Sequence, residues 1–102
     1  MKVVEFDGER LQLAFGRYAN GRTAMRLYMD DGTPYATATT NLPDENIEED
    51  EVIIKNWEEN RGVLDALQAA EVVSECVRII AVNKYVDAHV CRLLISEVDD
   101  VC

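Results

Sequence analysis

The amino-acid sequence predicts an α+β fold: a mostly antiparallel β-sheet meander with one amphipathic helix packed on one face. Three observations lead to this prediction. Residues 1–42 contain short apolar stretches separated by glycine turns. Residues 61–71 carry apolar side chains at helical spacing. Residues 76–95 are rich in Val, Ile and Leu, which favour strands. With 102 residues, 48% of them hydrophobic, the chain is expected to form a single domain over 1–102.

The first part of the chain is expected to form two hairpins that share a strand. Strands over 2–6 and 9–18 are joined by Asp7-Gly8, a strong signal for a two-residue turn. The next turn, 19–21, fits three residues with Gly21 in the left-handed conformation, because a two-residue turn would mix the two faces of the sheet. The predicted buried face then consists of Phe15, Met25, Leu13, Leu27, Leu11 and Met29.

A further turn at 30–32 returns the chain as a strand over 34–41. A two-residue loop at this turn would place Ala36 on the buried face, and a three-residue loop would place Tyr35 there. We favour the two-residue loop. Pro34 lacks a backbone donor and therefore indicates that this strand begins at a sheet edge.

The second half is expected to add a short strand, the helix and a final hairpin. The strand covers 52–56, and Glu59 or Asn60 caps a helix of about 61–71. The apolar stripe of this helix is Val63, Leu64, Leu67 and Ala70.

The last hairpin pairs 76–82 with 85–95 and turns at Asn83-Lys84, which places Cys76 opposite Cys91. A polar, acidic tail over 97–102 is expected to fray.

An acidic connection over 43–51 separates the two halves. Six of the eight residues in 44–51 are acidic, and none is basic. Residues 41–102 hold fifteen acidic and five basic residues, which accounts for the whole formal charge of −10. This asymmetry predicts one strongly negative surface whose field steers partners.

The charge and composition also exclude classes of partner. A chain this acidic is expected to be repelled by nucleic acid and anionic lipid, which bind through Lys and Arg. We find no signal-peptide pattern and no apolar run long enough to span a membrane, so we expect a cytoplasmic protein. Three cysteines, an odd number, indicate reduced thiols.

No pattern for catalysis, a metal or a cofactor emerges. His89 is the only histidine, and neither serine lies in a nucleophile motif, so we expect a protein that is not an enzyme. Cys76, His89 and Cys91 could begin a zinc site, but they lack a fourth ligand and are better explained as core residues. The acidic run fails a calcium-loop template, because Glu49 and Lys55 occupy its diagnostic sixth and twelfth positions.

Three stretches resemble a family of small uncharacterised proteins carried by plasmids, phages and conjugative elements of gut bacteria. They read DEVIIKNWEENRGVLDAL at 50–67, GTPYATATTNLP at 32–43 and YVDAHVCRL at 85–93. The three stretches are spread over residues 32–93, which is most of the chain, and the resemblance implies no catalytic residue. It implies accessory cargo of a mobile element, a setting in which small acidic proteins often inhibit host nucleases, either restriction enzymes or CRISPR effectors.

We therefore expect an acidic protein–protein interaction module that binds the basic surface of a nucleic-acid-binding host nuclease, as an anti-CRISPR or anti-restriction protein would. The alternative is a module that self-associates as a homodimer through a sheet edge or the helix. Trp57 can be an exposed anchor or part of the core. The expected partner-binding residues are Asp44, Glu45, Glu48, Glu49, Asp50, Glu51, Trp57, Glu58 and Glu59.

Overall fold

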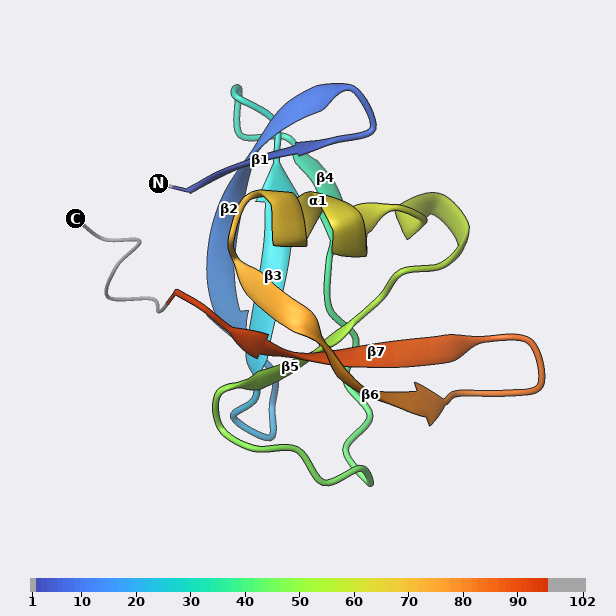
Figure 1. Cartoon of the computed structure of the whole chain (residues 1–102). Coiled ribbons are helices and arrows are strands. Elements are labelled where there is room, and N and C mark those ends of the chain that lie inside the picture. The colour runs from blue at the N-terminus through green and yellow to red at the C-terminus, as the bar shows by residue number, and fades with distance from the viewer. Residues whose placement is uncertain (1, 96–102) are drawn as a thin grey trace.

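The computed structural model describes residues 2–95 and confirms the α+β fold (Figure 1). Seven strands, one short α-helix and one 3-10 turn are present in this part of the chain. In chain order the elements are β1 (Val3–Phe6), β2 (Glu9–Arg17), β3 (Thr23–Tyr28), β4 (Pro34–Thr37), β5 (Glu51–Ile54), the 3-10 turn η1 (Glu58–Asn60), α1 (Val63–Ala69), β6 (Val73–Ala81) and β7 (Asp87–Leu93). The predicted tail over 97–102 lies outside the described residues.

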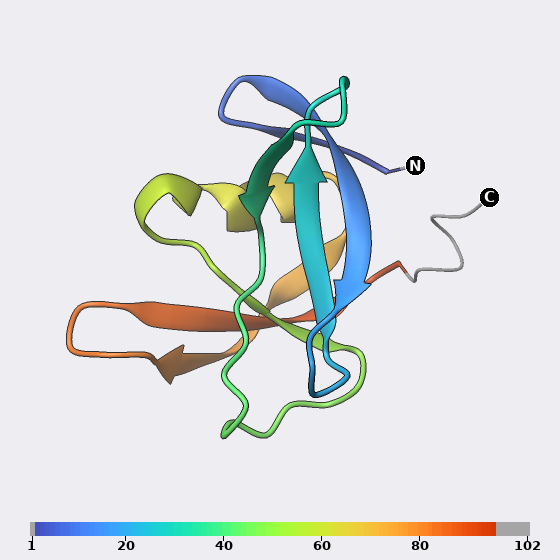
Figure 2. The same cartoon turned by 180° about the vertical axis from the view of Figure 1, so that it is seen from behind.

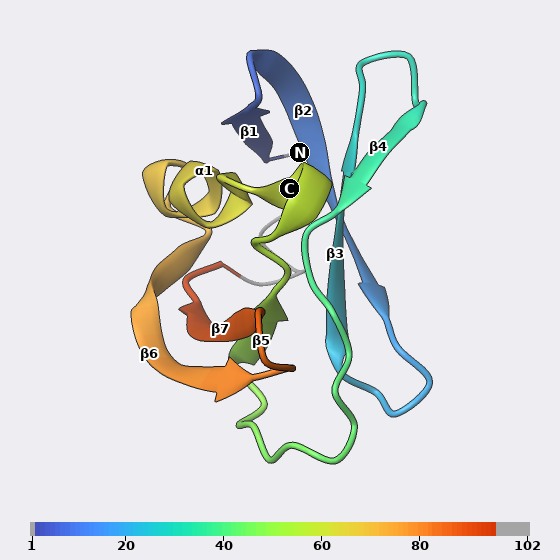
Figure 3. The same ribbon diagram turned by 90° about the vertical axis from the view of Figure 1, so that its right-hand side faces the viewer.

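The strands form two antiparallel sheets, which Figures 2 and 3 show from two further sides. The first has the order β1-β2-β3-β4 and the second the order β5-β7-β6. A bridge between Thr39 and Ile54 connects the two sheets, and Lys55 N–H donates to the Ala38 carbonyl at 2.8 Å beside it. The chain after β4 therefore extends the first sheet as far as β5 of the second.

The first meander has the predicted register. Val4 pairs with Leu11 across the first hairpin, and Leu13 pairs with Leu27 across the second. Gly21 has a φ of 86°, so the turn between β2 and β3 uses the left-handed conformation that was expected. The predicted face is buried at Leu11, Leu13, Met25 and Leu27 and partly buried at Phe15 and Met29.

The turn between β3 and β4 combines the two alternatives that the sequence left open. Met29 N–H donates to the Thr33 carbonyl at 2.8 Å, which makes the loop three residues long. A bulge between the Tyr28–Pro34 and Leu27–Ala36 pairs then shifts the register by one residue. The preference for a two-residue loop was wrong, although the face that it predicted for Ala36 is the observed one.

The last hairpin follows the same design. Val82 N–H donates to the Val86 carbonyl at 2.9 Å, so the turn is longer than the predicted Asn83-Lys84. A register shift between Cys76 and Arg78 restores the predicted pairing of Cys76 with Cys91. β7 is the central strand of its sheet, and β5 and β6 flank it.

The helix is shorter than predicted and begins differently. α1 starts at Val63 after Gly62, whose φ of 96° lies in the left-handed region. Neither Glu59 nor Asn60 caps it, because both belong to η1. The side chain of Asn56 acts instead, and its Oδ1 accepts hydrogen bonds from the N–H groups of Gly62 (3.1 Å) and Leu64 (3.0 Å).

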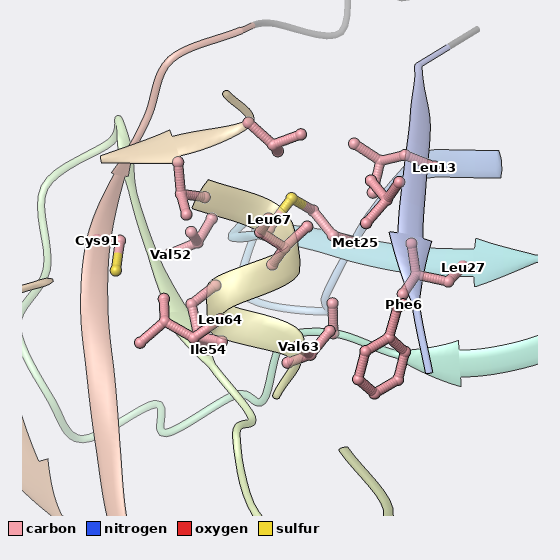
Figure 4. Close-up of a cluster of buried hydrophobic side chains, with 14 of the residues drawn as sticks. Phe6, Leu13, Met25, Leu27, Val52, Ile54, Val63, Leu64, Leu67 and Cys91 are labelled. Carbon is pink, nitrogen blue, oxygen red and sulfur yellow. The ribbon is translucent and has the colours of Figure 1, made fainter. Parts of the chain in front are cut away.

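The main core lies between the four-stranded sheet on one side and α1 with the second sheet on the other (Figures 3 and 4). The predicted helical stripe contributes Val63, Leu64 and Leu67 to it. A smaller cluster on the opposite face of the second sheet is built from buried Ile53, Ala88 and Val90. Partly buried Leu42, Ile47, Trp57 and Ile80 pack against this smaller cluster.

Candidate acidic interaction surface

The acidic loop, residues 43–50, connects the extension of β4 to β5 and lies at one end of the molecule, the lower end in Figure 1. Apolar contacts attach it to the body: Leu42, directly before the loop, and Ile47, in its middle, pack against the smaller core cluster. The loop is one residue shorter than the predicted connection, because Glu51 already belongs to β5.

Two arginines bind the backbone of this region. From the β2–β3 turn, Arg22 donates through Nη1 to the Leu42 carbonyl at 2.7 Å and through Nη2 to the Glu45 carbonyl. From β6, Arg78 donates through Nη2 to the Asn46 carbonyl at 2.6 Å. Both guanidinium groups therefore satisfy backbone acceptors of the acidic loop.

The carboxylates of the acidic loop are not part of this scaffold. Within residues 2–95 they take part in no ion pair and in no side-chain hydrogen bond, although both arginines lie close by. All five acidic residues of the loop are exposed: Asp44, Glu45, Glu48, Glu49 and Asp50. The loop thus combines an ordered backbone with a solvated array of negative charge.

Glu51 departs from the exposed position that the sequence predicted. It is only 5% exposed. Its Oε1 accepts a hydrogen bond from Glu48 N–H at 2.9 Å, and its Oε2 accepts one from Arg78 Nη1 at 3.1 Å. The Glu48 N–H, and to a lesser extent the Arg78 guanidinium, lower the pKa of the Glu51 carboxyl. Glu51 belongs to the scaffold of the acidic loop rather than to its surface.

The three remaining predicted residues lie elsewhere. Trp57 is half-buried and packs against the smaller core cluster, so it is not a fully exposed anchor. Glu58 and Glu59 are exposed on η1, beside α1 and away from the acidic loop (Figures 1 and 3). Glu59 also forms a salt bridge with Lys55 at 3.1 Å. The expected single surface of nine residues is therefore reduced to the five carboxylates of the acidic loop.

A cleft of about 870 Å³ opens beside the acidic loop. Its walls come from the β2–β3 turn, the second half of the loop and residues 93–95 at the end of β7. Arg17 and Arg22 line one side, and Glu48–Glu51 line the other. The cleft therefore has walls of opposite charge, and the carboxylates border it on one side only.

The cysteine and histidine residues of the last hairpin, Cys76, His89 and Cys91, lie close in register on β6 and β7. Cys91 is fully buried, and burial, followed by the neighbouring Cys76, raises its pKa to about 12. Such a thiol is un-ionised at neutral pH and is a poor nucleophile or ligand. His89 pairs with Ile54 and Ile79, and no metal-binding group of three or more His, Cys, Asp or Glu side chains occurs within residues 2–95.

Sequence reasoning did not find Arg22 and Arg78 as the residues that hold the backbone of the acidic loop. Arg22 lies 20 and 23 residues from its two acceptors, and Arg78 lies 32 residues from Asn46. No local pattern marks contacts at such separations. An arginine in a turn and one on a strand are ordinary surface residues until the fold is known.

Comparisons with protein-family models, curated proteins and solved structures returned no match for this chain. Among residues 2–95, no helix has the combination of length and apolar character needed to cross a bilayer.

Proposed function

We propose that this protein is a non-catalytic interaction module whose acidic loop binds a basic surface on another protein. One observation carries the proposal. Hydrogen bonds hold the backbone of the acidic loop, whereas its five exposed carboxylates have no partner within residues 2–95. Carboxylates that served the fold would be paired with the nearby guanidinium groups, as Glu51 is. The carboxylates of the acidic loop are instead available to a partner.

The bonds from Arg22 and Arg78 support this function by reducing the cost of binding. A flexible loop loses backbone and side-chain entropy when it docks. Here the carbonyls of Leu42, Glu45 and Asn46 are already bound, so much of that ordering is complete before a partner arrives. The charge array then acts mainly on the rate and specificity of association.

A nucleic-acid-binding protein is the partner class that fits best. Its groove is lined with Lys and Arg that neutralise phosphates, and an array of carboxylates can occupy the same groups. The resemblance of the chain to proteins of mobile elements supports a host defence nuclease, of the restriction or CRISPR type, as the particular target. In this function the protein competes with nucleic acid without binding it.

The test is capture of partners from a host lysate on immobilised protein at low salt, followed by elution with a salt gradient. The informative variant replaces Asp44 and Asp50 with Asn and Glu45, Glu48 and Glu49 with Gln. We expect a basic nuclease to be retained by the wild type and lost from this variant. Nuclease assays with the eluted partner should show inhibition by the wild type that weakens as salt rises.

A matched control removes the same amount of charge elsewhere. Five exposed acidic residues outside the acidic loop serve this purpose: Glu5, Asp65, Glu71, Glu75 and Asp87. Their neutral amide counterparts should leave capture almost unchanged. If both variants lose the partner equally, net charge and not the acidic loop is responsible. If neither loses it, the proposed binding surface is wrong.

A further inference from the structure

The outer edge of β6 is the longest strand edge left open in residues 2–95. β6 has nine residues, whereas β1, at the end of the other sheet, has four. The edge of β5 is covered by the chain that follows β4, through the Thr39–Ile54 bridge. β4 has only four residues, and Asn60 Nδ2 donates to its last carbonyl, that of Thr37, at 2.5 Å. Figures 1 and 2 show that the β6–β7 hairpin extends well beyond the body of the molecule.

This hairpin also carries most of the exposed apolar surface. Ile79 is 59% exposed and Tyr85 is 89% exposed. Of the six large hydrophobic residues that are exposed within residues 2–95, four lie on β6 or the turn that follows it: Val77, Ile79, Val82 and Tyr85. An open strand edge with apolar side chains is a template for pairing with another strand.

The hydrogen bonds of the turn show which backbone groups of β6 face its open edge. Val82 N–H donates to Val86 and therefore faces β7. Backbone groups of an antiparallel strand alternate in direction, so the N–H and C=O groups of Ala81 and Ile79 face outward. The pairing from Arg78 to Ala81 is regular, whereas the bulges lie nearer the start of the strand. The free template is therefore the second half of β6.

We propose that this edge binds the same edge of a second copy, with the two β6 strands antiparallel and Ile79 at the two-fold axis. This register pairs Ile79 with Ile79, Val77 with Ala81 and Arg78 with Ile80. It uses the outward backbone groups of Ile79 and Ala81 and brings apolar side chains together. No like charges face each other.

Registers with the two-fold axis two residues away, which would use the same outward-facing backbone groups, are less favourable. An axis at Ala81 would place Arg78 opposite Lys84, two like charges. An axis at Val77 would place the Glu75 carboxylate opposite Ile79, which separates the apolar side chains. Like charges or a charge and an apolar side chain placed opposite each other across two strands destabilise the pairing. The sequence of β6 therefore favours the two-fold axis at Ile79. This interface lies outside the acidic loop and does not depend on the function proposed for that loop.

The interface is tested by sedimentation of the full chain over a range of concentrations at about 0.1 M and about 1 M salt. Each copy has a formal charge of −10, so screening should strengthen the dimer as salt rises. Binding of the acidic loop to a basic partner has the opposite salt dependence, which keeps the two surfaces distinguishable.

Two variants act on different parts of the interface. Ile79→Lys places two lysines opposite each other at the axis and should abolish the dimer. Ala81→Pro removes an outward donor at an edge position where proline is tolerated, and it should weaken the dimer while leaving most of the apolar surface in place. Leu94→Lys is the control, because it makes the same charge change at another exposed apolar residue.

Amide hydrogen exchange locates the interface independently of mutation. The Ile79 and Ala81 amides should become protected as the protein concentration rises, while the exposed amides of the acidic loop should not change. A protein that stays monomeric at every salt concentration overturns the proposal. A dimer that survives both Ile79→Lys and Ala81→Pro also overturns it, because such a dimer forms through another surface.

Discussion

Glu51 illustrates how one carboxylate in an acidic run supports the fold while its neighbours remain in water. Its two oxygens receive the Glu48 N–H and the Arg78 guanidinium, and its side chain is buried. Removing this carboxylate leaves both donors without their acceptor. A lost hydrogen bond that involves a charged group typically destabilises a protein by about 1.5–3 kcal/mol.

Glu51→Gln should therefore lower the free energy of unfolding by about 1–2 kcal/mol at neutral pH, because an amide keeps one acceptor oxygen but loses the charge. Chemical denaturation followed by the fluorescence of Trp57 measures this change. The control is Glu49→Gln, at an exposed position in the same run, which should have little effect. Equal effects of the two substitutions would contradict the structural role of Glu51.

The ionisation of Glu51 should also make the free energy of unfolding depend on pH. The folded-state pKa of Glu51 is lowered from its ordinary value of 4.5, so folding favours the ionised form. The resulting stability is present above that ordinary value and is lost as the pH falls through the folded-state pKa. The difference in unfolding free energy between wild type and Glu51→Gln should therefore shrink below about pH 4.5. A difference that stays constant down to the acid transition would rule out this linkage.

The sequence identified the acidic run but not the one residue in it that turns inward. Strand alternation assigns faces only once the start of a strand is known, and the run gives no apolar signal at that point. Arg78, the ion-pair partner of Glu51, lies 27 positions away in the sequence. It belongs to β6, which β7 separates from β5 in the sheet. Long-range pairing of this kind determines which carboxylate is desolvated.

At the scale of single elements, the turns explain both the success and the failure of the sequence predictions. The β3–β4 and β6–β7 hairpins each have a turn longer than predicted and a bulge that shifts the register back. The hydrophobic pattern determined the faces, since a lasting one-residue slip would expose the core. The pattern does not distinguish a two-residue turn from a three-residue turn followed by a bulge. Both give the same register further along the hairpin and therefore bury the same residues.

The start of the helix supplies a prediction for an element. Asn56→Ala removes the side-chain acceptor of the Gly62 and Leu64 amides and should destabilise the protein by about 1 kcal/mol. Asn56→Asp keeps an acceptor oxygen and should restore most of this stability. Thermal unfolding followed by circular dichroism compares these variants with the control Asn46→Ala, whose side chain is exposed. Failure of the aspartate to restore stability would show that the hydrogen bonds of Asn56 are not responsible.

At the scale of the whole molecule, the unpaired charge is a cost to the folded state. The chain carries a formal charge of −10, and compact folding brings like charges together. The five carboxylates of the acidic loop contribute to this repulsion without forming ion pairs within residues 2–95. Within the described part of the chain this repulsion is not offset by ion pairs, which agrees with the proposal that these carboxylates serve a partner and not the fold.

The variant with all five carboxylates of the acidic loop replaced by amides should therefore be at least as stable as the wild type. Its unfolding midpoint should stay level or rise by a few degrees, because a gain of about 1 kcal/mol shifts the midpoint of a domain this size by about 4–8 °C. Thermal unfolding at low salt is the measurement, since screening at high salt should remove the difference. A clear loss of stability would mean that these carboxylates hold the fold together.

The position of the acidic loop directly before β5 also matters while the protein is being made. β5 is completely buried in the folded chain, and its partner β7 begins at Asp87, 33 residues after Ile54. At about 5–20 residues per second, synthesis leaves the apolar segment Val52–Ile54 without its partner for roughly 2–7 s. Charged residues that flank such a segment oppose its aggregation. We therefore expect the acidic loop to oppose aggregation of the nascent chain during the interval before its second sheet can form.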